Sequence, residues 1–274
     1  MFLKDILVHV DDSDGASVRV QTAAALAASH GARLTGFHVR PVIEIPYLAR
    51  SFNGPGLAEA LAKAADALST EARALFTRHT ATHSDTRWED LTGSMVEEAV
   101  ARARCSDLIV LGPSEVDQPS GRRLSGQIIQ GSGTPVLMVP ERPALSTVGQ
   151  RVLVAWNASP ESIRAVRSAL PILKAATSVE VLVILAGEPD ASQPTPGQPL
   201  VDYLAQHGIA AAVKAMNLDE VYGVGGSILA RAEGTGADLI VMGAFGRSRL
   251  REAMIGSTTG TLLTRSAVSL LVSH

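Results

Sequence analysis

The sequence has few aromatic residues, a single cysteine and no long apolar run, and each shortage excludes a class of protein. Aromatic residues make up 4% of the 274 residues, too few for the stacking platforms that bind single-stranded nucleic acid. The one cysteine, Cys105, leaves no internal disulfide and suits a reducing compartment. Nowhere do about 18 apolar residues follow one another, the length that a membrane-spanning helix needs.

Neither sign of charge dominates the chain. Its 24 Lys and Arg residues stand against 27 Asp and Glu residues, a net charge of -3, and the pI is about 6.2. This balance predicts no basic surface for DNA or for an anionic membrane. The N-terminus reaches Asp5 without the apolar core of a signal peptide. We therefore expect a cytoplasmic protein that binds neither nucleic acid nor membrane.

The sequence pattern occurs twice. An apolar run, a turn with serine, an amphipathic stretch and a second apolar run span residues 5–39 and recur over 150–185. SDLIVLGP (106–113) likewise matches ADLIVMGA (237–244), and TPVLMVP (134–140) matches VSLLVSH (268–274). A repeat this long indicates two copies of a whole domain. We predict domains over residues 1–141 and 150–274, joined by the Pro- and Ser-containing link 140–149.

Each copy alternates apolar runs with helical patterns. The runs at 5–10, 33–39, 107–111 and 135–139 suit parallel strands buried on both faces. Less apolar third strands are expected near 86–90 and 209–215. One helix is expected over 56–79. A second helix is expected to begin at the cap Ser159-Pro160 and to bury the face formed by Ile163, Val166, Leu170 and Leu173. The pattern predicts the α/β class, with two tandem five-stranded, Rossmann-like domains of parallel strands.

A glycine-rich stretch follows the apolar run 238–242. It reads MGAFGRSRLREAMIGSTTG (242–260), with Gly243, Gly246 and Gly256 followed by Ser257. Ligands bind such sheets beyond the carboxyl ends of the strands, and glycine lets a sugar or phosphate approach the backbone closely. The helix expected over 257–265 would offer free N–H groups to an anion, and Arg247, Arg249 and Arg251 add positive charge. We interpret the stretch as a phosphate-binding loop.

The commoner phosphate motifs are absent from the chain. GxxxxGK[ST] does not occur, and GxGxxG follows the first strand of neither copy. YGVGGSI (222–228) misses that spacing, and we interpret it as a loop that caps a helix over 227–235.

The spacing G-x2-G-x9-G-S, with its place between the fourth and fifth strands, resembles the ATP-binding signature of the universal stress protein family in its tandem form. The resemblance covers nearly the whole chain and implies two domains of the adenine-nucleotide alpha-hydrolase-like type. It also implies an ATP site in the second copy, with contacts from Ala155, Trp156, Asn157, Leu185, Met242, Gly243, Gly246, Arg247, Gly256, Ser257 and Thr258. The family usually has aspartate where Asn157 stands, so we expect any Mg²⁺ to be held through the phosphates alone.

The first copy departs from the signature in the opposite way. It keeps an aspartate, Asp11, after its first strand, but Arg122-Arg123 stand where the second copy has Gly256-Ser257. Glu115 and Asp117 bring further negative charge to this loop, which disfavours phosphate. We therefore expect a degenerate first copy, in which Asp11 caps a helix.

Three functions follow as hypotheses. The leading one is a nucleotide-binding stress or regulatory protein that binds ATP in its second copy. In this hypothesis the protein has no set of metal ligands and no catalytic residue. A slow ATPase is the second, although Glu252 is the only carboxylate near the glycines. The third is a nucleotide-free scaffold that acts through protein contacts. Closing strands 135–139 and 268–273 are expected to join the copies as an intramolecular pseudo-dimer, and a further homodimer stays open.

Overall fold

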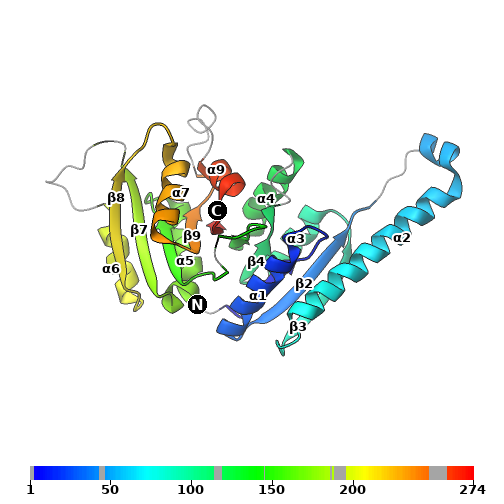
Figure 1. Cartoon of the computed structure of the whole chain (residues 1–274), viewed down its shortest axis with the longest axis horizontal. Coiled ribbons are helices and arrows are strands. Elements are labelled where there is room, and N and C mark those ends of the chain that lie inside the picture. Colours follow the sequence, from blue (N-terminus) through cyan, green and yellow to red (C-terminus); the bar gives the residue numbers. More distant parts are fainter. Residues whose placement is uncertain are drawn as a thin grey trace.

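Two copies of one strand order form a single sheet in the computed structural model, which describes residues 3–42, 47–113, 119–144, 146–185, 187, 196–246 and 258–274. The sheet has ten strands in the order β3-β2-β1-β4-β5-β10-β9-β6-β7-β8 (Figure 1). The N-terminal half contains β1 (Asp5–His9), α1 (Ala16–His30), β2 (Arg33–Arg40), α2 (Tyr47–His79), β3 (Thr86–Thr92), α3 (Met95–Ala103), β4 (Leu108–Leu111), α4 (Pro119–Ser132) and β5 (Val136–Met138).

The C-terminal half repeats this order. It contains β6 (Arg151–Ala155), α5 (Pro160–Ala175), β7 (Ser178–Leu185), α6 (Gln198–Gln206), β8 (Ala211–Asn217), α7 (Gly223–Thr235), β9 (Leu239–Gly243), α9 (Thr258–Arg265) and β10 (Ser269–Ser273). Each half therefore has the five strands that the sequence predicts, and β3 and β8 are the less apolar third strands. Within each half the paired strands are parallel.

The two halves join through their last strands. β5 and β10 pair antiparallel, with Met138 opposite Leu270 and Val136 opposite Val272. These are the segments that the sequence predicts as the meeting edge. Because the pairing is antiparallel, the strands of one half run opposite to those of the other, and their carboxyl ends lie at opposite edges of the sheet.

Side chains of the central strands are buried on both faces of the sheet. Ile6 and Val8 contribute to one apolar cluster with α1, α2, α5 and α6, whereas Leu7 belongs to a second cluster with α3, α4, α7 and α9. Both clusters continue across the β5–β10 junction, because each includes residues of both halves. The strand alternation and the near-continuous apolar runs agree with helices on both faces.

An aspartate at the start of a central strand fixes the neighbouring strand in each half. Asp238, before β9, accepts backbone N–H bonds from Gly149, Gln150 and Arg151 at 3.0, 3.1 and 3.0 Å. Asp107, before β4, accepts from Lys4 and Asp5 at 2.7 and 3.0 Å. The DLIV segment of each half therefore contains an aspartate with the same structural role, which is to bind the backbone N–H groups at the start of the neighbouring strand.

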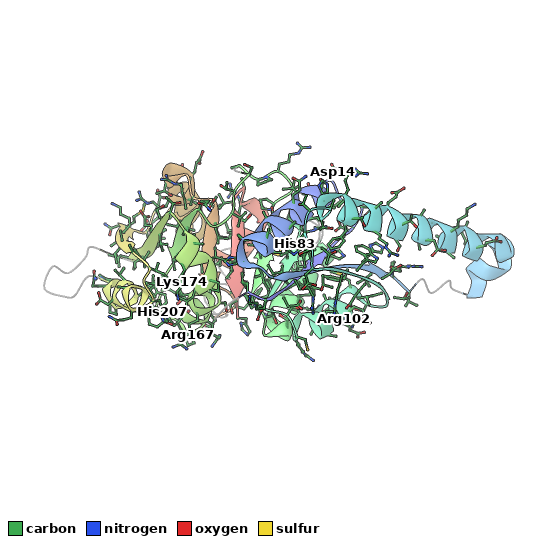
Figure 2. The ribbon with its side chains drawn as sticks, turned by 90° about the horizontal axis from the view of Figure 1, so that it is seen from below. Asp14, His83, Arg102, Arg167, Lys174 and His207 are labelled. Carbon is green, nitrogen blue, oxygen red and sulfur yellow. The ribbon has the colours of Figure 1, made fainter. Side chains whose placement is uncertain are left out.

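One predicted helix start is confirmed, and another helix is longer than predicted. The Ser159 hydroxyl caps α5 as expected, accepting from the N–H of Ser162 at 3.1 Å. Helix α2, predicted over 56–79, begins nine residues earlier, at Tyr47. It extends past the end of the sheet in both views (Figures 1 and 2). Arg102 and His83 of the same half, labelled in Figure 2, lie closer to the sheet than this extended part of α2 does. No helix in the described ranges is long and apolar enough to cross a membrane.

The interpretation of 222–228 as a loop is wrong, because α7 already begins at Gly223. The glycines serve close helix packing instead. A Cβ at Gly225 would lie 2.9 Å from the Cβ of Thr261 on α9. Helices that approach this closely need a residue without a side chain at the contact.

Candidate functional site

A pocket of about 470 Å³ lies at the carboxyl ends of β6, β7 and β9 in the C-terminal half. Its volume is in the range of small-molecule sites, and its place at the strand ends is the usual one for this architecture. Strands and α7 supply the apolar wall, which consists of Ala155, Leu182, Ile184, Val224, Ile228 and Met242. Such a wall suits a flat, weakly polar ring.

The polar side of the pocket comes from the turn after β6 and from the start of α9. The Oδ1 atom of Asn157 accepts from the N–H of Ser159 at 3.1 Å, and both residues line the pocket. Thr258 and Thr259, the first residues of α9, line it as well. Together these residues add hydroxyl and amide groups to the pocket.

Two non-glycine residues with positive φ lie in the turns that contribute to the pocket. Ala158 has φ 58° in the turn after β6, and Phe245 has φ 55° in the turn after β9. The left-handed region is unfavourable for residues with a Cβ and persists where the surroundings impose it. The two turns that border the pocket therefore have imposed backbone conformations.

Gly243 and Gly246 both lie against Glu161 of α5. A Cβ at Gly243 would lie 2.5 Å from the backbone carbon of Glu161 and from the nitrogen of Ser162. A Cβ at Gly246 would lie 3.2 Å from Oε2 of Glu161. The absence of a side chain at Gly243 thus allows α5 to approach the end of β9, a packing role that the sequence analysis did not assign to it.

Glu161 is the carboxylate that the sequence analysis missed. It lines the pocket, its side chain is 12% exposed, and its Oε1 accepts from Nη2 of Arg164 at 3.0 Å. Partial burial opposes ionisation, but hydrogen bonds from its own N–H, from Ser159 and from Arg164 outweigh it and hold the pKa of Glu161 below its usual range. The pocket therefore contains an ionised carboxylate, paired with Arg164, at neutral pH.

The structure brings most of the predicted site residues together. Those that line the pocket are Ala155, Trp156, Asn157, Met242, Gly243, Gly246 and Thr258. Leu185 is not among the lining residues, because its side chain packs with the α5 and α6 cluster on the other face of the sheet, and Leu182 and Ile184 take its place. Arg247, Gly256 and Ser257 lie outside the described residues, as do Glu252, Glu115 and Asp117.

Arg19 covers the end of β4 in the N-terminal half. The strand registers align Asp5 with Arg151, so Gly112 corresponds to Gly243 and Arg19 to Ala165. Arg19 is 1% exposed, and its Nη1 would lie 1.7 Å from a Cβ at Gly112. A cavity of about 580 Å³ lies nearby between the strand ends and α2, but Gly112 does not line it. The guanidinium therefore covers the end of β4, where the C-terminal half is open.

Asp11 pairs with this guanidinium and does not cap α1. The N-cap of α1 is Gly15, without a side-chain cap, so the expectation of a capping aspartate is wrong. The Oδ1 atom of Asp11 instead accepts from Nη2 of Arg19 at 2.5 Å and from the hydroxyl of Ser13 at 2.5 Å. Burial acts against ionisation, yet Arg19, His9 and Ser13 together lower the pKa of Asp11 to about 2.

The model of the universal stress protein family matches residues 3–140 and again residues 149–274. The chain belongs to this family. Each match covers one half of the ten-stranded sheet, so the chain contains two universal stress protein units in tandem, and the predicted fold class is confirmed.

Solved universal stress proteins share this fold over the whole chain. One from Archaeoglobus fulgidus is 16% identical, with a TM-score of 0.74, and the match covers 99% of this chain and 97% of that one. A putative universal stress protein from Pseudomonas aeruginosa, also 16% identical, has a TM-score of 0.56 over 99% and 93% of the two chains. At these identities the likeness shows the fold alone. A search of curated protein sequences finds no match.

The two units of this universal stress protein differ at the ends of their first and fourth strands. The first unit has the Arg19–Asp11 pair, with Arg19 buried, and the second has Ala165 and Asn157 at the same positions, together with the pocket. In the ranges that the structure describes, no three His, Cys, Asp or Glu side chains are grouped closely enough to hold a metal ion by themselves.

Proposed function

We propose that the C-terminal half binds an adenine nucleotide, ATP, and that the protein acts in stress response as a nucleotide-dependent regulator. One observation carries the proposal: the pocket at β6, β7 and β9 is lined by the first two glycines of the signature and by the β6 tip. It combines the apolar wall that adenine needs with polar groups from two turns. Family membership agrees with this proposal.

The lining residues suggest an orientation for the nucleotide. Adenine would pack on Ala155, Ile184 and Met242, and the amide of Asn157 would hydrogen-bond a ribose hydroxyl. The phosphates would extend from Gly246 to Thr258, the first residue of α9, because free N–H groups at a helix start attract anions.

One site per chain is the stoichiometry that we propose. In the N-terminal half the buried guanidinium of Arg19 covers the end of β4 and pairs with Asp11. The domains would extend over residues 1–141 and 150–274 and form an intramolecular pseudo-dimer through β5 and β10. We infer that this half supports the fold and offers a surface for protein contacts.

Binding, not hydrolysis, is the activity that the pocket favours. A water molecule that attacks a phosphate needs a group that accepts its proton or orients it. Glu161 is the only carboxylate among the described lining residues, and its lowered pKa makes it a weak proton acceptor.

A direct test is to denature the freshly purified protein, identify any released nucleotide by chromatography and mass spectrometry, and titrate the apo protein with MgATP by calorimetry. Gly246→Leu is the informative variant, since a Cβ there would meet only the flexible carboxylate of Glu161 while a larger side chain would enter the pocket. Gly234→Leu, in α7 with open space around it, is the matched control.

We expect about one ATP per chain in the wild type and in Gly234→Leu, with binding lost in Gly246→Leu. Two equivalents would mean that the N-terminal half also binds nucleotide. ADP alone would support a slow ATPase. No nucleotide, with no binding of added MgATP, would overturn the proposal and favour the scaffold.

A further inference from the structure

The carboxylate of Glu161 lies beside the glycine at which the proposed phosphates would begin. Its Oε2 atom is 3.2 Å from the position of a Cβ at Gly246, and both residues line the pocket. The packing of α5 against Gly243 fixes the backbone of Glu161 at this place. Arg164 binds the other oxygen, Oε1, at 3.0 Å, so Oε2 is held toward Gly246.

Glu161 is also the one charged side chain among the described residues that line the pocket. Arg164 offsets part of its negative charge through Oε1, and the second oxygen of this 12% exposed carboxylate would act on the phosphates. The equivalent position in the N-terminal half is Gly15, which has no side chain. The repeat therefore does not require a carboxylate here, and its effect is specific to the C-terminal pocket.

The oxygen groups that line the pocket suit a hard divalent cation. Asn157, Ser159 and Thr258 add amide and hydroxyl oxygens to the single carboxylate. Mg²⁺ in nucleotide sites is typically bound through one or two carboxylates together with substrate phosphates. The protein would then hold the cation with the nucleotide and not without it.

We infer that Glu161 is a charge filter, which repels free polyphosphate and admits ATP only as its complex with a divalent cation. This inference rests on the proposed function. It replaces our expectation that the phosphates alone hold the metal, because the Glu161 carboxylate would attract the cation while it repels the phosphates.

The test compares ATP affinity with and without Mg²⁺ in the wild type, in Glu161→Gln and in Glu233→Gln. Glu233 is an exposed glutamate of α7 that does not line the pocket, so the same substitution there is a matched control. Dissociation constants are measured by calorimetry for ATP in EDTA, for ATP in excess Mg²⁺ and for adenosine, which has no phosphate. Circular dichroism and the urea midpoint verify that each variant is folded.

In the wild type and in Glu233→Gln we expect ATP to bind at least about tenfold more weakly in EDTA than in Mg²⁺. In Glu161→Gln this ratio should fall below about threefold, chiefly because binding in EDTA becomes tighter. Adenosine should bind all three proteins alike under both conditions.

An equal Mg²⁺ ratio in the wild type and Glu161→Gln would overturn the charge filter, as would wild-type affinity for ATP that does not depend on Mg²⁺. Adenosine separates this failure from that of the proposed function. If adenosine binds and the Mg²⁺ ratio is unaffected by the substitution, the pocket is an adenine site without a filter. If neither adenosine nor ATP binds, both proposals are wrong.

Discussion

The buried Arg19 and the partly buried Asp11 form an ion pair in the N-terminal half, with Nη2 2.5 Å from Oδ1, at the strand end that corresponds to the open end of β9. Nε of Arg19 also donates to the carbonyl of His9 at 2.8 Å, so the guanidinium is held from two sides. The C-terminal half has Ala165 and Asn157 at these positions. A single charged pair thus distinguishes the covered end of β4 from the open end of β9.

Replacing Arg19 should destabilise the protein strongly. Arg19→Met leaves the carboxylate of Asp11 without its main partner, and breaking a buried pair costs about 3–5 kcal/mol of unfolding free energy. Urea denaturation measures the loss, with Arg78→Met on the exposed side of α2 as the control, expected within about 0.5 kcal/mol of the wild type. The double variant Arg19→Met/Asp11→Asn should recover much of the loss, because it removes the stranded charge. Equal costs for Arg19→Met and the control would contradict the role of the pair.

The same pair predicts a stability change at acidic pH. The pKa of Asp11 is lowered from 3.8 to about 2 in the folded state, so the folded protein binds this proton less readily than the unfolded chain. The stabilisation, about 2 kcal/mol, is fully present above about pH 4 and is lost as the pH falls through about 2. The difference in unfolding free energy between the wild type and Asp11→Asn should shrink over that window. A difference independent of pH between 5 and 2 would show that the carboxylate is not stabilised in this way.

Alanine at Gly243 should be costly although its backbone conformation is ordinary. Its Cβ would lie 2.5 Å from backbone atoms of α5, which have no flexible end to move. We expect a loss of about 1–3 kcal/mol in urea unfolding, the usual cost of overpacking. Gly234→Ala, within α7 and with open space around it, should stabilise by up to about 1 kcal/mol through helix propensity. Similar effects of the two substitutions would rule out the close approach of α5.

The shared sheet predicts that both halves unfold together. The chain has two tryptophans, Trp88 in β3 and Trp156 after β6. The single variant Trp88→Phe therefore leaves a fluorescent reporter only in the C-terminal half, and the single variant Trp156→Phe leaves one only in the N-terminal half. Because the apolar clusters cross the β5–β10 junction, we expect the two urea transitions to coincide. Two well-separated midpoints would mean that each half is stable without its neighbour.

Much of the fold follows from local sequence patterns, because strands buried on both faces read as short apolar runs and the runs recur at matching places in both halves. The 222–228 stretch shows the limit. Its glycines are typical of a loop. At Gly225, however, the missing side chain allows Thr261, which is distant in sequence, to pack closely. Val224 and Ile228 were therefore missed as pocket residues.

The candidate site was predictable where backbone motifs determine it. The glycines after β9 and the residues at the β6 tip were found because they stand at strand ends in a recognisable order. Glu161 was missed because its carboxylate reaches the pocket only through the packing of α5 against Gly243. Arg19 gave no signal either, since its ion pair with Asp11 depends on how the first turn of α1 lies over the end of β4.

The β5–β10 junction has a consequence for how this molecule can change. In an assembly of two identical chains, every substitution appears on both sides of the symmetry axis. Here both sides belong to one polypeptide, so a mutation alters one side and leaves the other as it was. Arg19 in the first half corresponds to Ala165 in the second, and Gly15 corresponds to Glu161. The backbone repeats in the two halves while the side chains at corresponding positions differ, which covalent linkage of the two halves makes possible.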